Sequence, residues 1–173
     1  MTSRTDQSGK LTQYSYDALG RLTQVTDSAN NLTGYSYDEA GNKLTQTDAL
    51  NRTTRWSYDA LGRETSRTLP LGQSDSSSYD ALGNLQSHTD FNGQVTRYQY
   101  DTNNRVTRID YDDATSETFS YDSEGRRTSA TTRDGQTQSW VYDTRGRLTL
   151  RILVIPITCS GFIRSPDLPN AMD

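Results

Sequence analysis

A Tyr-Asp pair recurs every 21 residues without an insertion or deletion, and this period constrains the fold more than any other feature of the chain. With only 31% hydrophobic residues, composition alone would predict disorder. A strict repeat argues against disorder, because each unit of a repeat array can bury its surface against its neighbours. The pairs are Tyr16-Asp17, Tyr37-Asp38, Tyr58-Asp59, Tyr79-Asp80, Tyr100-Asp101, Tyr121-Asp122 and Tyr142-Asp143.

The residues around each pair predict a β-hairpin. An aromatic residue stands two positions before each tyrosine, except at Ser77, and a period of two places both side chains on one face of a strand. Asp at the first turn position and Gly at the fourth are typical of a type I turn whose left-handed glycine supplies a bulge. This fourth position is held by Gly20, Gly41, Gly62, Gly83, Asn104, Gly125 and Gly146.

The second half of each repeat predicts a return strand and another turn. A basic residue or Asn follows the glycine, and a Thr-rich segment such as residues 22–26 comes next. The second turn has Gly, Asn or Ala in the equivalent place and is predicted to be looser than the first. Two strands of about five or six residues per repeat give about fourteen strands in all. We therefore expect an all-β fold, a continuous antiparallel β-hairpin meander in a curved or spiral sheet.

The repeated aspartates and tyrosines each allow two interpretations. The Asp carboxylates are expected to accept backbone N–H bonds within their own turns. The alternative is a catalytic pair or a calcium ladder, but equivalent turns offer no unique site and no calcium-binding motif is present. The aromatic rows are expected to pack across strands, although tyrosines on a sheet can also bind sugars or stacked bases.

The repeat register divides the chain into two regions. Residues 1–150 are predicted to be a repeat array of about seven units that begins inside the second half of a repeat. Residues 151–173 form a non-repeat tail with an apolar run from Ile152 to Ile157. Two interpretations of this tail stay open: a frameshifted or recombined end, or a short strand that covers the edge of the sheet.

Several classes of function lose support from the sequence. A formal net charge of −4 offers no basic field for nucleic acid. The single cysteine, Cys159, and the single histidine, His88, have no partners for a disulfide or a zinc site. We find neither a signal peptide nor an apolar run long enough for a membrane span, and the location of the protein is not predicted. No nucleophile motif, metal cluster or phosphate loop is present, so we predict no enzyme activity, no catalytic or metal-binding residues and no cofactor.

The motif of residues 14–23, aromatic-x-Tyr-Asp-x-x-Gly-Arg-Leu-Thr, resembles the YD repeats of bacterial Rhs (rearrangement hotspot) proteins, and the resemblance covers about residues 2–149. Related repeats occur in insecticidal toxin-complex shells and in teneurins. The resemblance implies a spiral β-sheet that forms a hollow shell around a C-terminal toxin, delivered in many cases by type VI secretion, and a parent family that is secreted or presented at the cell surface.

The sequence therefore predicts a structural segment of an Rhs-type polymorphic-toxin shell without delivery, self-cleavage or toxin regions. The alternative is a cell-surface adhesion or carbohydrate-binding repeat module. Expected partners are neighbouring repeats or other copies of the chain at open sheet edges, and a toxin cargo in a full-length parent, with no nucleic acid. The positions expected to carry the repeat structure are Tyr16, Asp17, Gly20, Tyr37, Asp38, Gly41, Tyr58, Asp59, Gly62, Tyr79, Asp80, Gly83, Tyr100, Asp101, Asn104, Tyr121, Asp122, Gly125, Tyr142, Asp143 and Gly146.

Overall fold

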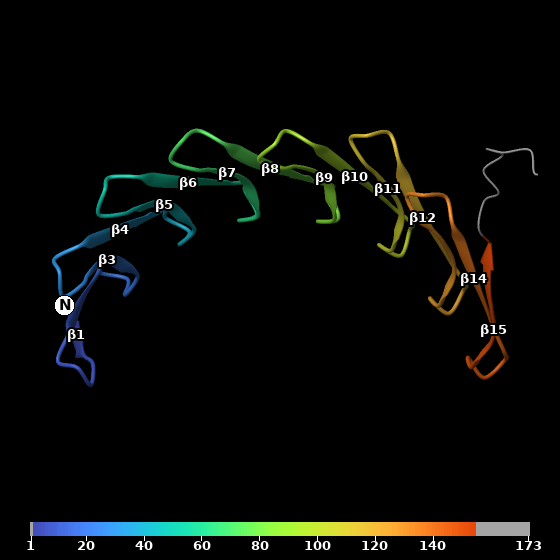
Figure 1. Ribbon diagram of the computed structural model, residues 1–173, viewed down its shortest axis with the longest axis horizontal. Coiled ribbons are helices and arrows are strands. Elements are labelled where there is room, and N and C mark those ends of the chain that lie inside the picture. The colour runs from blue at the N-terminus through green and yellow to red at the C-terminus, as the bar shows by residue number, and fades with distance from the viewer. Residues whose placement is uncertain (1, 155–173) are drawn as a thin grey trace, which may run out of the picture. The chain divides into compact units, whose positions relative to one another are not determined.

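The computed structural model describes residues 2–154, which form β-strands joined by tight turns and contain no helix (Figure 1). The chain divides into two compact units, with the boundary between Thr115 and Ser116. In each unit, strands that follow one another in the sequence pair side by side and antiparallel. The prediction of an all-β antiparallel hairpin meander is confirmed.

The first unit contains eleven of the strands. They alternate between six-residue strands that end in the repeated tyrosine and five-residue return strands, after a short first strand. The strands are β1 (Thr2–Thr5), β2 (Leu11–Tyr16), β3 (Leu22–Thr26), β4 (Leu32–Tyr37), β5 (Lys43–Thr47), β6 (Thr53–Tyr58), β7 (Glu64–Thr68), β8 (Ser74–Tyr79), β9 (Leu85–Thr89), β10 (Val95–Tyr100) and β11 (Val106–Asp110).

The second unit continues the same pattern of a long strand followed by a return strand. Its strands are β12 (Ser116–Tyr121), β13 (Arg127–Thr131), β14 (Thr137–Tyr142) and β15 (Leu148–Val154). Strand β15 runs past the end of the repeat register, and Ile152 to Val154 pair with β14. The rest of the predicted tail, including Ile155 to Ile157 and Cys159, lies outside the described residues.

Each repeat contains one regular and one bulged hairpin. Across the turn after β2, Ser15 pairs with Gln24 but Tyr16 pairs with Leu22, so the return strand has one extra residue. The pairing of β3 with β4 has no such shift. The bulge recurs directly before every repeated tyrosine whose hairpin lies within one unit. Because a bulge bends and twists its strand, the shift changes the local direction of the sheet once per repeat.

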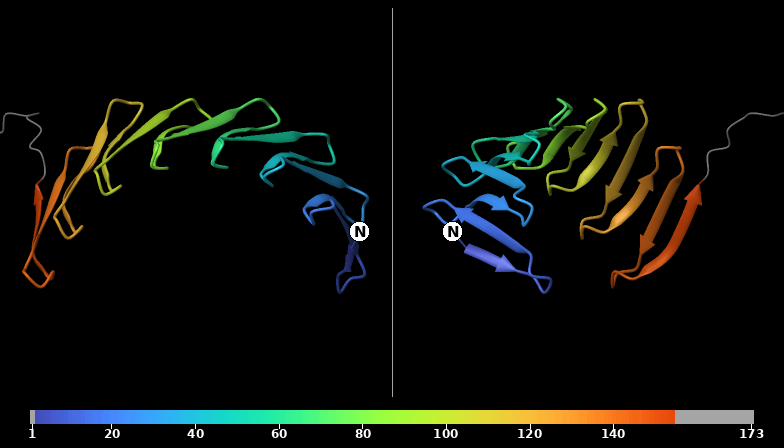
Figure 2. Two further views of the ribbon diagram at one scale, coloured as in Figure 1. Left: turned by 180° about the vertical axis from the view of Figure 1, so that it is seen from behind. Right: turned by 60° about the vertical axis from the view of Figure 1, so that its left-hand side comes forward.

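The sheet has no second layer within either unit, as Figure 2 shows. In the described range Ala130, at 9% exposed, is the only buried hydrophobic residue, and no polar residue is buried. The aromatic side chains are mostly half-buried against neighbouring strands, whereas leucines at the turn tips, such as Leu61 at 75%, are exposed. Stability must therefore come from contacts between adjacent repeats instead of from a central core.

Candidate functional site

The repeated Asp closes its turn with both carboxylate oxygens. Asp17 Oδ1 accepts backbone N–H bonds from Leu19 and Arg21, each at 2.9 Å, and Asp17 Oδ2 accepts the Nε–H of Arg21 at 2.6 Å. On the backbone, Asp17 donates to the Arg21 carbonyl and Gly20 donates to the Asp17 carbonyl. Gly20 has φ +79°, and Asn104 holds the same left-handed position with φ +60°. We call this element, from Asp to Arg or Asn, the Tyr-Asp turn.

These hydrogen bonds hold the Asp carboxylates in their charged form. The backbone N–H of Arg21 and then its side chain lower the pKa of Asp17 below the ordinary value of 3.8. The backbone N–H of Arg63 lowers the pKa of Asp59 in the same way. Both groups are therefore carboxylates at neutral pH, and their oxygens already have partners within the turn. In residues 2–154 no group of three or more His, Cys, Asp or Glu side chains gathers in a way that could hold a metal ion.

The second turn of the repeat, which we call the return turn, has the same backbone geometry. Asp27 donates to the Asn31 carbonyl at 3.0 Å and Asn30 donates to the Asp27 carbonyl at 3.0 Å. Asn30 has φ +62°. The prediction of a looser second turn is therefore wrong for the backbone. The backbone bonds do not require Asp, because the same pair forms in the turns that start at Leu69, Tyr111 and Thr132.

The repeated tyrosine joins each repeat to the one before it. Tyr58 closes strand β6, and its hydroxyl donates to the Lys43 carbonyl on the adjacent strand β5 at 3.0 Å. Lys43 is the first residue of β5, at the bulge of the preceding hairpin. The same bond, always to the residue 15 positions earlier, is made by Tyr37, Tyr79, Tyr100 and Tyr142.

The residue after the glycine joins each repeat to the next one. Arg63 is anchored by Asp59 at 2.6 Å, and its guanidinium lies 4.6 Å from the ring centre of Tyr79. Arg63 Nη1 also donates to the Asp80 carbonyl at 3.3 Å. Arg21 and Arg126 likewise lie over the tyrosine of the next repeat. The sequence pattern showed a basic residue or Asn here, but it did not reveal this role between repeats.

Ser77 and His88 occupy a place where other repeats have an aromatic residue and its cross-strand partner. Ser77 Oγ lies 3.1 Å from His88 Nδ1, and the two residues are paired across β8 and β9. Nearby, Arg67 pairs with Asp75 at 2.9 Å and lies over Phe91. A local polar network thus replaces the missing ring.

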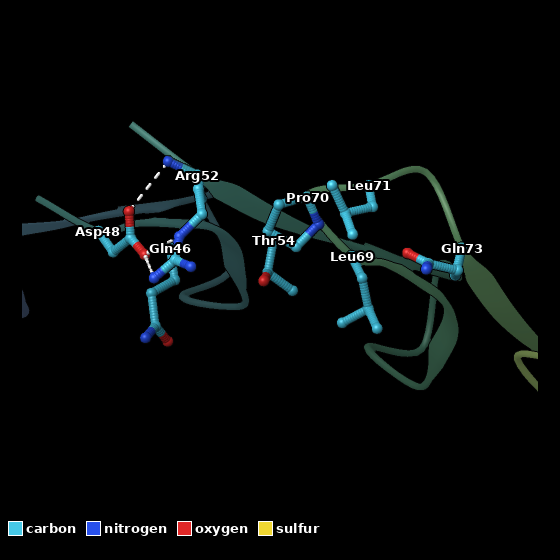
Figure 3. Close-up of a pocket in the computed structure, with 8 residues that line it drawn as sticks. All are labelled: Gln46, Asp48, Arg52, Thr54, Leu69, Pro70, Leu71 and Gln73. Atoms are coloured by element: carbon cyan, nitrogen blue, oxygen red, sulfur yellow. Dashed lines mark hydrogen bonds and ion pairs between the residues drawn. The ribbon is translucent and has the colours of Figure 1, made fainter. Parts of the chain in front are cut away.

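Two grooves between successive turns are large enough for a small ligand. One, of about 420 Å³, lies between two return turns, with Asp48 and Arg52 on one side and Leu69, Pro70 and Leu71 on the other (Figure 3). The other, of about 240 Å³, lies between two Tyr-Asp turns and has Tyr98 and Tyr100 in its lining. Both grooves lie within the first unit.

These features define a tandem β-hairpin repeat protein whose units are joined by hydrogen bonds and stacking contacts from the Tyr-Asp turns. The model of the RHS repeat family matches residues 1–31, 17–51, 37–74, 79–116 and 121–152. The chain belongs to the RHS repeat family, as the sequence motif predicted. No curated protein sequence matched the chain.

Several solved toxin-complex structures share the fold. The crystal structure of TcdB2-TccC3-Cdc42 aligns with a TM-score of 0.63 and 21% identity over 87% of this chain and 9% of that one. The structure of a Photorhabdus luminescens Tc holotoxin pore with a mutated TccC3 aligns with a TM-score of 0.64 and 22% identity over 86% of this chain and 9% of that one. The crystal structure of TcdB2-TccC3 without its hypervariable C-terminal region aligns with a TM-score of 0.62 and 22% identity over 87% of this chain and 9% of that one. This chain therefore spans about a tenth of the length of the proteins that it resembles.

Proposed function

We propose that this chain is a structural segment of an RHS-type polymorphic-toxin shell, in which the repeats form part of the wall that encloses and delivers a toxin. The observation that carries the proposal is the tyrosine hydroxyl bond to the preceding repeat, which recurs with the same 15-residue separation at Tyr37, Tyr58, Tyr79, Tyr100 and Tyr142. The bond joins the first strand of each hairpin to the return strand of the hairpin before it, and so couples the two hairpins. The array therefore resists bending at individual hairpins, as a wall must.

The surfaces of the sheet also suit a wall element. No large side chain in the described range is fully buried, so both faces remain available for contact with other parts of a larger assembly. The described residues form no helix that is long and apolar enough to cross a membrane. Membership in a family of structural repeats favours a scaffold role over a catalytic one. Delivery by type VI secretion remains part of the proposal.

The proposal is tested on the protein in its native cells. We would place an affinity tag on the chromosomal gene, purify the product under native conditions, and treat it with protease before and after mild urea. We expect an assembly much larger than 19.4 kDa that contains a polypeptide without RHS repeats, which the protease cuts only after urea treatment. Recovery of the 19.4 kDa chain alone, cut to the same extent with and without urea, would contradict the shell role.

A matched pair of variants links that protection to the repeat contacts. Tyr58→Phe removes one hydroxyl bond between repeats and should increase cutting of the enclosed polypeptide. Leu61→Ser changes a turn-tip side chain that is 75% exposed and should leave the protection unchanged. Equal protection in both variants would argue against a wall that depends on the tyrosine bonds.

A further inference from the structure

The stacking of arginine on tyrosine between repeats is interrupted at Asn84. At the junctions of Arg21, Arg63 and Arg126, a guanidinium lies between 4.6 and 5.1 Å from the next tyrosine ring. Asn84 is too short for this, and its Nδ2 instead donates to Asp80 Oδ2 at 2.9 Å and Asn104 Oδ1 at 3.0 Å. The ring of Tyr100 in the next repeat therefore has no arginine over it.

Asn42 makes the same replacement in another repeat, but there a different cation covers an aromatic ring. Lys43, the next residue, lies 3.8 Å from the ring centre of Trp56. In the fourth repeat the residue after Asn84 is Leu85, which carries no charge. Within the described residues, no cation lies over Tyr98 or Tyr100. These two rings instead line the 240 Å³ groove.

The groove also offers hydrogen-bonding groups that the protein does not use. In the part of the chain that the structure describes, no side-chain hydrogen bond is formed by the Gln86 amide or the Tyr98 hydroxyl. Asn104 accepts one bond through Oδ1, which leaves its Nδ2 as a donor. Gln86 and Asn104 both line the groove and are exposed. Amides provide a donor and an acceptor on one rigid plane.

The charged groups of the groove disfavour an anionic ligand. Asp80 and Asp101 line it, and their carboxylate oxygens accept bonds from their own turns. Burial, followed by the proximity of Tyr98 and Asp80, raises the pKa of Tyr100, so its ring remains a neutral phenol. The lining contains these two aspartates and no Lys or Arg, so a phosphate or sialic acid group would meet net negative charge. A neutral ligand is favoured.

We propose that the groove formed by Asn84, Gln86, Tyr98, Tyr100 and Asn104 binds one unit of a neutral hexose-containing glycan. The C–H face of a pyranose ring is apolar and packs against an aromatic ring, while its equatorial hydroxyls pair with amide groups. A groove with aromatic walls and a few unpaired polar groups is the usual arrangement of a small-ligand site. Its volume, about 240 Å³, suits a single sugar unit better than a larger ligand. This binding role is separate from the proposed wall role and holds whether or not the chain encloses a toxin.

The test uses the full chain on a glycan array with neutral and sialylated glycans, followed by saturation-transfer NMR with the best neutral glycan. We expect binding to neutral glycans with weak affinity, and an about tenfold weaker affinity for Gln86→Ala because one or two hydrogen bonds are lost. Asn84→Arg introduces the arginine that most other repeats have at this position, fills the groove and should abolish binding. Asn42→Arg makes the same change at the junction before Tyr58 and should leave the affinity unchanged.

Each outcome bears on the proposal, provided that circular dichroism shows each variant to be folded. Loss of glycan binding in Asn84→Arg, together with unchanged binding in Asn42→Arg, supports the groove as the binding site. Equal binding by Asn84→Arg and the natural chain would overturn it, as would an array on which no neutral glycan binds. Preferential binding of adenosine or a short oligonucleotide in the same NMR experiment would also overturn it, since the rings would then stack on bases.

Discussion

The two turns of each repeat have the same backbone but different tolerance for their first residue. Every Tyr-Asp turn starts with Asp, whereas return turns start with Asp, Leu69, Tyr111 or Thr132 and still form the same pair of backbone bonds. The two turns differ in the contacts made by the arginine that the first Asp of the turn holds. Arg63, in a Tyr-Asp turn, contacts the next repeat and is 27% exposed. Arg52, anchored by Asp48 in a return turn, is 61% exposed.

This contrast indicates that the Asp of the Tyr-Asp turn does more than close a hairpin. A left-handed residue and the backbone bonds suffice for closure, as the turn at Leu69 shows. In the Tyr-Asp turn the carboxylate also fixes the arginine that stacks on the following tyrosine. The strict period of the sequence therefore follows from contacts between repeats, and the return turns are freer because the described contacts there remain mostly within one hairpin.

The largest expected effect is that of acid, because it acts on all carboxylate turns together. Hydrogen bonds lower the pKa of the turn aspartates below 3.8, so they bind fewer protons in the folded chain than in the unfolded chain. Their contribution is fully present above the unfolded pKa and is lost as the pH falls through the folded pKa. We expect the melting temperature to be constant between pH 7 and 5 and to drop steeply below about pH 4.

NMR can separate the two turn types during that titration. The amide of Gly62 lies in a turn with a carboxylate and should shift as Asp59 takes up its proton. The amide of Gly72 lies in the turn that starts at Leu69, which has no carboxylate, and should shift much less before unfolding. Similar titration of both glycines would contradict the assignment of acid sensitivity to the Asp turns.

The next largest effect is expected at the tyrosine that joins repeats. Tyr58→Ala removes a half-buried ring and its hydroxyl bond, and should lower the free energy of unfolding by about 3 kcal/mol. Tyr58→Phe removes only the hydroxyl and should cost about 1 kcal/mol. Urea unfolding followed by circular dichroism measures both. A Phe variant as stable as the natural chain would mean that the bond to the Lys43 carbonyl adds nothing to stability.

The hairpins were predictable because they depend on local chemistry. Asp, Gly and the period-two aromatics each have a backbone preference that acts within one turn or strand, so residues 14–20 specify a hairpin without information from the rest of the chain. The same reasoning underestimated how regular the backbone of the return turn is. There, Asn30 and Ala114 adopt the same left-handed conformation as glycine, at φ +62° and +63°. The backbone bonds thus impose the conformation even where the residue does not favour it.

The contacts between repeats were harder to predict. The bond from Tyr58 to the Lys43 carbonyl depends on the bulge between Ser36 and Tyr37, which shifts the register of one hairpin by one residue. The sequence predicts a bulge at the turn glycine, but this one-residue shift lies within the paired strands and leaves no mark in a sequence whose period is constant. The groove at Asn84 depends in turn on the absence of an arginine at this position, which has meaning only once the stacking of Arg63 on Tyr79 is known.

A paired substitution tests the difference between the turns directly. Asp59→Ala and Asp48→Ala both remove carboxylate bonds to backbone N–H groups of their own turns. Asp59→Ala also removes the anchor of Arg63 and with it the contacts to Tyr79, whereas Asp48→Ala otherwise frees only an exposed Arg52. We expect the lower melting temperature for Asp59→Ala. When Asp59→Ala is combined with Tyr79→Ala, the loss of stability should be smaller than the sum of the two single losses, because both changes remove the same contact. The losses caused by Asp48→Ala and Tyr79→Ala should instead be additive. Additivity in both cycles would show that the two turns are equivalent.

The smallest effect is expected at Ala114, where a return turn holds an unfavourable backbone conformation. Its φ of +63° is left-handed, which costs an L-residue with a Cβ roughly 1–2 kcal/mol. Glycine avoids this cost but loses more entropy on folding, so Ala114→Gly should stabilise the chain by about 0.5 kcal/mol. Asn51→Gly, at φ +58°, is the matched control and should gain less, because Asn tolerates this region better than Ala. Thermal unfolding of both variants measures the two effects. A destabilised Ala114→Gly variant would mean that the Ala methyl group makes a favourable contact that outweighs the strain. Return turns would then be less free to vary than their first residues suggest.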